Sequence, residues 1–149
     1  MSVQTVLVAV DDDDTDRLDS LAEAAIDLSK PAGATVELAH AFSDVEYDEA
    51  KARLDSADKT VTPTTVARQD GLLGDLGDQL EAAGLSYNTH GCLSEGNGGG
   101  VAELADELDA DFVVVGGSKR APSGKVVFGS TAQSVIVDVP CPVTLVKGE

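Results

Sequence analysis

One stretch of the chain, from residue 113 to residue 131, concentrates residue types that could bind an anion. It runs from an apolar strand into glycines, crosses a loop with three of the ten basic residues, and ends in hydroxyls at the start of a predicted helix. Free backbone N–H groups and the helix dipole favour an anion at such a helix start. The stretch therefore predicts phosphate binding; basic side chains that only solubilise a loop, with Ser130 as a helix cap, are the alternative. Its chemistry-bearing residues are Val115, Gly116, Lys119, Arg120, Lys125, Gly129, Ser130 and Thr131.

A run of carboxylates follows the first apolar strand, which ends at Val10. Aspartate stands at positions 11 to 14 and at position 16. In one interpretation Asp13 or Asp14 caps the following helix, and the other carboxylates stabilise its positive end by about 0.3 to 1 kcal/mol each. In the other, Asp11 points into a cleft, where it accepts a hydrogen bond from a ribose hydroxyl or helps to hold a divalent cation such as Mg²⁺ or Mn²⁺. The residues alone leave both interpretations open.

These residues need a scaffold that brings strand ends together, and the hydrophobic pattern predicts one. Unbroken apolar runs alternate with helical spacing, which is typical of a parallel sheet covered by helices on both faces. The predicted fold class is α/β, a doubly wound sheet in a single domain of residues 1–149. Ligands of such sheets bind beyond the carboxyl ends of the strands, which selects the loops after Val10, His40 and Val115. The predicted strands cover 3–10, 34–42, 85–93, 112–115 and 142–147, the predicted helices cover 15–29, 65–83, 101–109 and 130–138, and 43–63 is a polar, partly helical or mobile excursion.

Charge limits the classes of partner. The 149 residues carry a formal net charge of −17, from ten Lys and Arg against 27 Asp and Glu. This field repels phosphate backbones and anionic headgroups, so neither general nucleic-acid binding nor membrane binding is expected. The composition, rich in Asp and poor in Lys and aromatic residues, is typical of a protein adapted to concentrated salt; an acidic surface in a low-salt organism is the alternative. The apolar run of residues 6–10 is too short for a signal peptide, which predicts a cytoplasmic protein.

The thiols and imidazoles show no catalytic or metal-ligand spacing. Cys92 and Cys141 lie in or beside apolar runs, as small buried residues do, with a redox or dimer role as the alternative. His40 ends the second predicted strand and His90 lies in the third, and both are expected to be structural histidines. The sequence contains no nucleophile elbow. Beyond Asp11 and the basic loop it offers no residue to orient water or to stabilise developing charge, so any hydrolase activity is expected to be slow.

Several motifs together resemble a known family across nearly the whole chain. They are Val8-Ala9-Val10-Asp11, His40-Ala41, the glycines at 96–100, and the stretch from Gly116 to Pro142-Val143. This pattern resembles the universal stress protein family and its UspA-like domain. Nucleotide-binding members of that family carry Gly, two residues, Gly, nine residues, then Gly-Ser or Gly-Thr. Gly116 and Gly129-Ser130 match this spacing, but Lys119 stands at the second glycine.

The resemblance implies a fold of the adenine nucleotide alpha hydrolase type, with sheet order 3-2-1-4-5, and ATP as the ligand. It places Val10 and Ala41 against the base and Asp11 near the ribose or a metal ion. Around the ribose and phosphates it places Gly116, Gly129, Ser130 and Thr131. Lys119 would either supply charge to a phosphate or fill the space that a phosphate needs, and these two roles stay open.

Two functions follow, with a slow ATPase as a weaker third. The first is a small ATP-binding protein of the stress response, and the alternative is a nucleotide-free dimeric stress protein that acts through protein partners. The resemblance also implies a homodimer through the fifth predicted strand, around Val143 and Leu145, because an open sheet edge invites another strand. A monomer in which residues 43–63 shield that edge is the alternative.

Overall fold

A computed structural model describes residues 3–11, 14, 17–42, 44–54, 67, 71–93, 100–120, 123, 126–128 and 130–147. The strands are β1 (Thr5–Val10), β2 (Thr35–Phe42), β3 (Tyr87–Leu93), β4 (Phe112–Arg120), β5 (Val126–Phe128) and β6 (Val143–Lys147). The helices are α1 (Leu18–Ser29), α2 (Asp44–Leu54), α4 (Gly71–Ala82), α5 (Gly100–Glu107) and α6 (Ser130–Asp138). In this part of the chain, no helix is both long and apolar enough to span a membrane.

All strands in the described ranges belong to one sheet, and its parallel strands confirm the predicted order. They lie in the order β3-β2-β1-β4-β6, so the fifth predicted strand is β6. The short β5 is additional and pairs antiparallel with the end of β4. Register places Val10 opposite His40 and Ala9 opposite Val115, which brings the carboxyl ends of β1, β2 and β4 to one edge.

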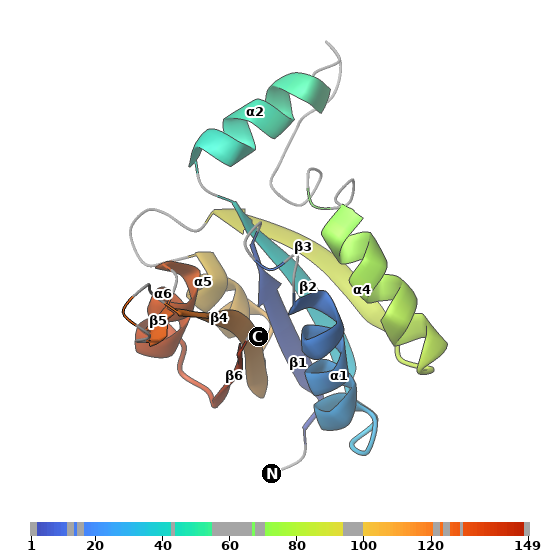
Figure 1. Cartoon of the computed structure of the whole chain (residues 1–149). Helices are drawn as coiled ribbons and strands as arrows, with labels where there is room; N and C mark the ends of the chain where they lie inside the picture. Colours follow the sequence, from blue (N-terminus) through green and yellow to red (C-terminus); the bar gives the residue numbers. More distant parts are fainter. Residues whose placement is uncertain are drawn as a thin grey trace.

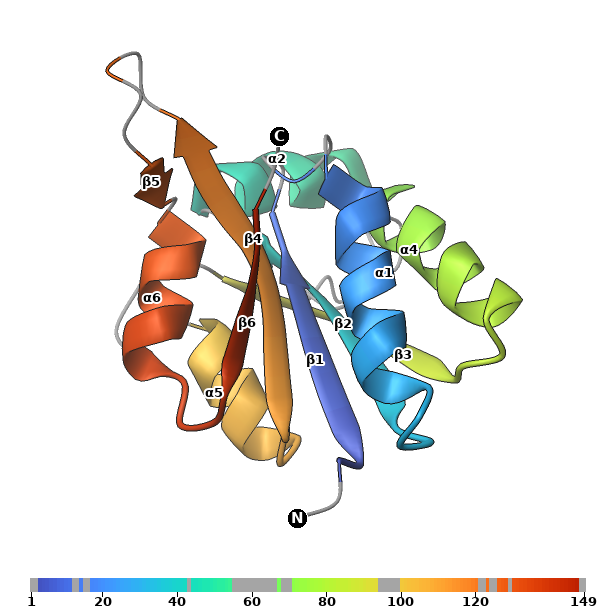
Figure 2. The ribbon, with the colours of Figure 1, turned by 60° about the horizontal axis from the view of Figure 1, so that its bottom comes forward.

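Helices cover both faces of the sheet, which confirms the doubly wound α/β class. Figure 2 shows α1 and α4 on one side of the strands and α5 and α6 on the other. Successive strand residues point to opposite faces, so each strand contributes to two cores. Val6, Val8 and Val10 pack with α1 and α4, whereas Leu7 and Ala9 pack with α5 and α6. This double burial is the reason why the strands read as unbroken apolar runs.

Glycines are required where elements meet closely or turn. Gly84 follows α4 with a φ of +83°, the left-handed conformation that glycine commonly adopts where a helix ends. Gly100, the last residue of the glycine run, opens α5 directly against β3. A Cβ at Gly100 would lie 2.8 Å from the Cβ of Cys92, a distance that real Cβ atoms do not adopt. The residues between Leu93 and Gly100 lie outside the described part.

Two sequence expectations about local structure are wrong. The fourth strand was expected to end at Val115 and to lead into a loop, but β4 continues to Arg120 and forms a hairpin with β5. Asp14 was a candidate cap for the first helix. Instead, α1 begins at Leu18 with Arg17 in the cap position and no side-chain cap hydrogen bond, while Asp14 closes the preceding turn.

The polar excursion after β2 is helical in its first part. It forms α2, which contacts β2 and lies beyond the carboxyl end of that strand (Figure 1). The remainder of the excursion, residues 55–63, lies outside the described residues.

Candidate functional site

The positions selected from the sequence, around Val10, His40 and Val115, lie side by side in the sheet, but the side chains there divide between two faces. Val10 is fully buried on the face of α1 and α4. Ala41 and Val115 are buried on the face of α5 and α6. Val10 and Ala41 therefore do not form one side-chain surface for a base. Contacts from both to one base would need main-chain atoms at the strand ends.

Asp11 is held by a short turn at the end of β1. The N–H of Asp11 donates to Oδ2 of Asp14 at 2.9 Å, and the N–H of Asp14 donates to the carbonyl of Asp11 at 3.0 Å. The Asp11 side chain is half-buried. The carboxylate predicted to meet a ribose or a cation thus projects from a turn that is fixed by a second carboxylate.

Arg17 is a residue of this region that the sequence reasoning missed. Its Nε lies 3.4 Å from Oδ1 of Asp14, and the two side chains are only 6% and 3% exposed. Each buried charge has an opposite charge beside it, so the loss of either partner would leave the other buried and uncompensated, which is strongly unfavourable. A signal was present in the sequence, since Arg17 is the only basic residue among the first 29 and stands within the aspartate run.

Gly116 lies directly beneath this ion pair. A Cβ at Gly116 would lie 2.6 Å from Cδ of Arg17 and 2.6 Å from Oδ1 of Asp14. Contacts this short do not occur for real Cβ atoms, so any other residue would force Arg17 or Asp14 to shift, and the packing of the chain itself favours glycine. The glycine that matches the family spacing therefore has a structural reason as well as the predicted ligand role.

The basic segment is a hairpin that leads to a helix start. In register, Ser118 lies opposite Phe128 and Lys119 lies opposite Val127. Only the main chain is described for Lys119, Ser130 and Thr131, and Gly129 and Lys125 lie outside the described residues. α6 begins at Ser130, so the helix start expected from the sequence is present next to this hairpin. The two roles of Lys119 stay predictions.

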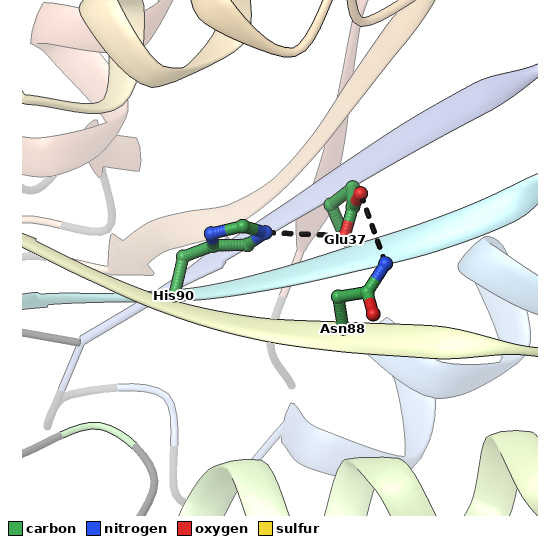
Figure 3. Close-up of polar contacts among 3 residues, drawn as sticks. All are labelled: Glu37, Asn88 and His90. Carbon is green, nitrogen blue, oxygen red and sulfur yellow. Dashed lines mark hydrogen bonds and ion pairs between the residues drawn. The ribbon is translucent and has the colours of Figure 1, made fainter. Parts of the chain in front are cut away.

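A second polar cluster lies on β2 and β3, away from these strand ends (Figure 3). The buried carboxylate of Glu37 lies 3.1 Å from Nε2 of His90 and accepts a hydrogen bond from Asn88 Nδ2 at 3.2 Å. Asn88 and His90 also line an open groove of about 750 Å³ along β3. The other histidine, His40, is buried and stacks on Phe42 with ring centroids 4.0 Å apart. Both histidines thus contribute to packing or to a structural polar contact.

The cysteines lack the environment of reactive thiols. Both are free, and burial raises the pKa of Cys92 to about 12. Desolvation also raises the pKa of Cys141, and the nearby negative charge of Asp111 acts in the same direction. Within the described ranges, no three His, Cys, Asp or Glu side chains converge as ligands of a metal ion.

Comparisons with known proteins agree on one family. The model of the Universal stress protein family matches residues 2–147. The structure of a universal stress protein from Archaeoglobus fulgidus matches with 25% sequence identity and a TM-score of 0.67. The match covers 97% of this chain and 98% of the other. A search of proteins with curated functions found no match.

Two further solved structures share the fold and hold adenine nucleotides. A universal stress protein in complex with cAMP has 21% identity and a TM-score of 0.65, over all of both chains. A universal stress protein family protein from Arabidopsis thaliana with AMP bound has 15% identity and a TM-score of 0.59, over 98% of this chain and 92% of its own. The match to nearly every residue, on a doubly wound sheet of the predicted order, shows that this chain belongs to the universal stress protein family.

Proposed function

We propose that this protein is a cytoplasmic stress-response protein that binds an adenine nucleotide, ATP in the first place, at the carboxyl ends of β1, β2 and β4. One observation carries the proposal. Gly116 and the start of α6 at Ser130 are joined by the basic hairpin, at the sheet edge where β1 also ends, just before Asp11. A glycine backbone, basic side chains and the N-terminus of a helix together suit the binding of a phosphate group at the edge of a doubly wound sheet. The relatives solved with cAMP and AMP support an adenine nucleotide.

In this proposal Asp11 binds the ribose or a divalent cation. Gly116, Gly129, Ser130 and Thr131 surround the ribose and phosphates. The base lies at the strand ends near Val10, Ala41 and Val115. A Mg²⁺ or Mn²⁺ ion beside Asp11 would also bind oxygen atoms of the phosphates and water.

The first test is what the purified protein already carries. Denaturation of the protein in high salt, followed by anion exchange of the supernatant, should release material with adenine absorbance. Calorimetric titration with ATP then compares the wild type with the double variant Gly129→Val, Ser130→Ala, which removes a hydroxyl donor and blocks the approach of phosphate to the backbone. The double variant should lose ATP binding and keep its circular dichroism spectrum.

Ser134→Ala is the matched control for this experiment, because Ser134 lies one turn further along α6 and its hydroxyl faces Asp138 at 3.4 Å. This control should bind ATP as the wild type does. If all three proteins bind ATP with equal affinity, ATP does not bind at the start of α6 and this site is wrong.

The alternative, a nucleotide-free dimer that acts through protein partners, has its own support. In the described sheet β6 pairs only with β4, which leaves its outer edge open to a second strand. Two exposed apolar side chains of α6, Ile136 at 47% and Val137 at 79%, belong to the helix that packs beside β6. Val143 and Leu145 of β6 are half-buried. We propose a homodimer that pairs β6 across a two-fold axis, with or without nucleotide.

Hydrogen-bond direction in β6 gives a sharp test of this dimer. The N–H of Val113 donates to the carbonyl of Pro142 at 3.0 Å, and Val113 lies opposite Val143. In a pair of parallel strands, the N–H groups of successive residues point alternately toward the partner strand and away from it. The N–H of Thr144 therefore points toward β4, and the N–H of Val143 points outward. Val143→Pro should therefore give a folded monomer by light scattering, whereas Thr144→Pro should destabilise the fold. A wild type that scatters as a monomer at micromolar concentration in high salt would refute the dimer.

The net charge of −17 supports a further proposal, that the protein is adapted to concentrated salt. Self-repulsion of this size weakens the folded state unless ions screen it, and the screening length falls to about 3 Å at 1 M salt.

A further inference from the structure

The ion pair over Gly116 occupies the surface that the proposed ligand would contact. Arg17 Cδ and Asp14 Oδ1 lie so close to Gly116 that even a methyl group would not fit between them. Both side chains are buried, so this contact is part of the packed interior and no open space lies over the glycine. A ribose phosphate that reaches Gly116 must displace at least one of the two side chains.

The chemistry of the pair decides which ligands can do so. A guanidinium binds carboxylate and phosphate with the same planar set of donors, so a phosphate can replace Asp14 as its partner. A neutral ligand offers no such replacement and would leave a buried cation without its counter-ion, which is strongly unfavourable. The carboxylate that is released keeps a second partner, because Oδ2 of Asp14 accepts the N–H of Asp11 at 2.9 Å.

We propose that Arg17 is the residue by which this site selects phosphorylated ligands. Without ligand, its guanidinium pairs with Asp14 over Gly116. With ligand, it exchanges Asp14 for a phosphate group. The inference rests on the proposed nucleotide site. It adds a specificity determinant at the residue before α1, which lies outside the glycine motif of the chain.

The exchange also links the two halves of the site. Asp14 fixes the turn that carries Asp11, and Arg17 covers the glycine of β4. When Arg17 exchanges Asp14 for a phosphate, Oδ2 of Asp14 can keep its hydrogen bond with the N–H of Asp11, so Asp11 stays in place. Ribose recognition through Asp11 and phosphate recognition through Arg17 would act on the same nucleotide from neighbouring positions.

The experiment compares the affinities of adenosine and AMP by calorimetry in high salt. The variant is Asp14→Asn with Arg17→Gln, which removes both buried charges together and so leaves neither ion unpaired. The control is Lys30→Gln, which removes one positive charge from an exposed position just beyond the other end of α1. The wild type and the control should prefer AMP. The double variant should bind AMP about 10- to 100-fold more weakly, the size of one lost charged hydrogen bond, and should bind adenosine no worse than before.

A second readout follows the guanidinium itself. The Nε–H resonance of Arg17, assigned by its loss in Arg17→Gln, should move when AMP is added and stay in place with adenosine. Binding of both ligands with an unchanged preference in the double variant would overturn the role of Arg17. Tighter binding of both ligands by the same factor would also overturn it, because the pair would then only fill space. Absence of binding to the wild type and to Lys30→Gln would refute the nucleotide site as well.

Discussion

Replacing Gly116 by alanine tests whether the ion pair of Arg17 and Asp14 is packed as the structure shows. The added Cβ would lie 2.6 Å from an atom of each side chain, about 1 Å inside ordinary contact distance. Overpacking of a tight site costs about 1 to 3 kcal/mol, and splitting a buried ion pair costs about 3 to 5 kcal/mol. We therefore expect Gly116→Ala to lower the free energy of unfolding by at least about 2 kcal/mol.

Urea denaturation in concentrated KCl measures this loss, and two further proteins make it interpretable. Gly74→Ala in α4 is the control, because a Cβ at Gly74 meets nothing within 4 Å. That substitution should raise stability by about 0.5 to 1 kcal/mol through helix propensity. In the double variant Gly116→Ala, Arg17→Ala, the added methyl group no longer meets the arginine side chain. The loss of stability in the double variant should therefore be smaller than the sum of the losses in the two single variants. A Gly116→Ala protein as stable as the wild type, or strictly additive losses, would refute the packing argument.

The other predictions concern pH, thiol reactivity and salt. Backbone N–H groups of Gln4 and Thr5 donate to Asp111 and lower its pKa, so its stabilising effect is present above the ordinary carboxyl pKa and is lost as pH falls through the lowered value. Asp111→Asn should accordingly lower the melting temperature at pH 7, and a gap to the wild type that does not shrink on acidification would contradict this. Cys92, with its pKa of about 12, should react with a thiol reagent at pH 8 more slowly than Cys141. Labelling followed by mass spectrometry measures the two rates, and faster labelling of Cys92 would contradict the prediction. The melting temperature should fall on transfer from multimolar to millimolar KCl, and an unchanged value by calorimetry would exclude adaptation to salt.

Local pattern determined most of the architecture of this protein. Residues 130–138 are helical with the bounds that their spacing predicted, and Gly84 has the positive φ expected of a residue that ends a helix. The alternation of apolar runs and helical periods predicted parallel strands covered on both faces. These features depend on neighbours within a few residues, because backbone hydrogen bonds and the burial of one helix face impose short periods on the sequence.

Long-range contacts decided the rest, and they are where the sequence expectations were wrong or incomplete. The opposite faces of Val10 and Ala41 and the burial of Arg17 on Gly116 both join segments that are distant along the chain. Hydrophobic spacing carries no information on such pairs, since many partners satisfy the same local pattern. Strand register and the closeness of α1 to β4 select one partner, and this selection exists only in the tertiary structure.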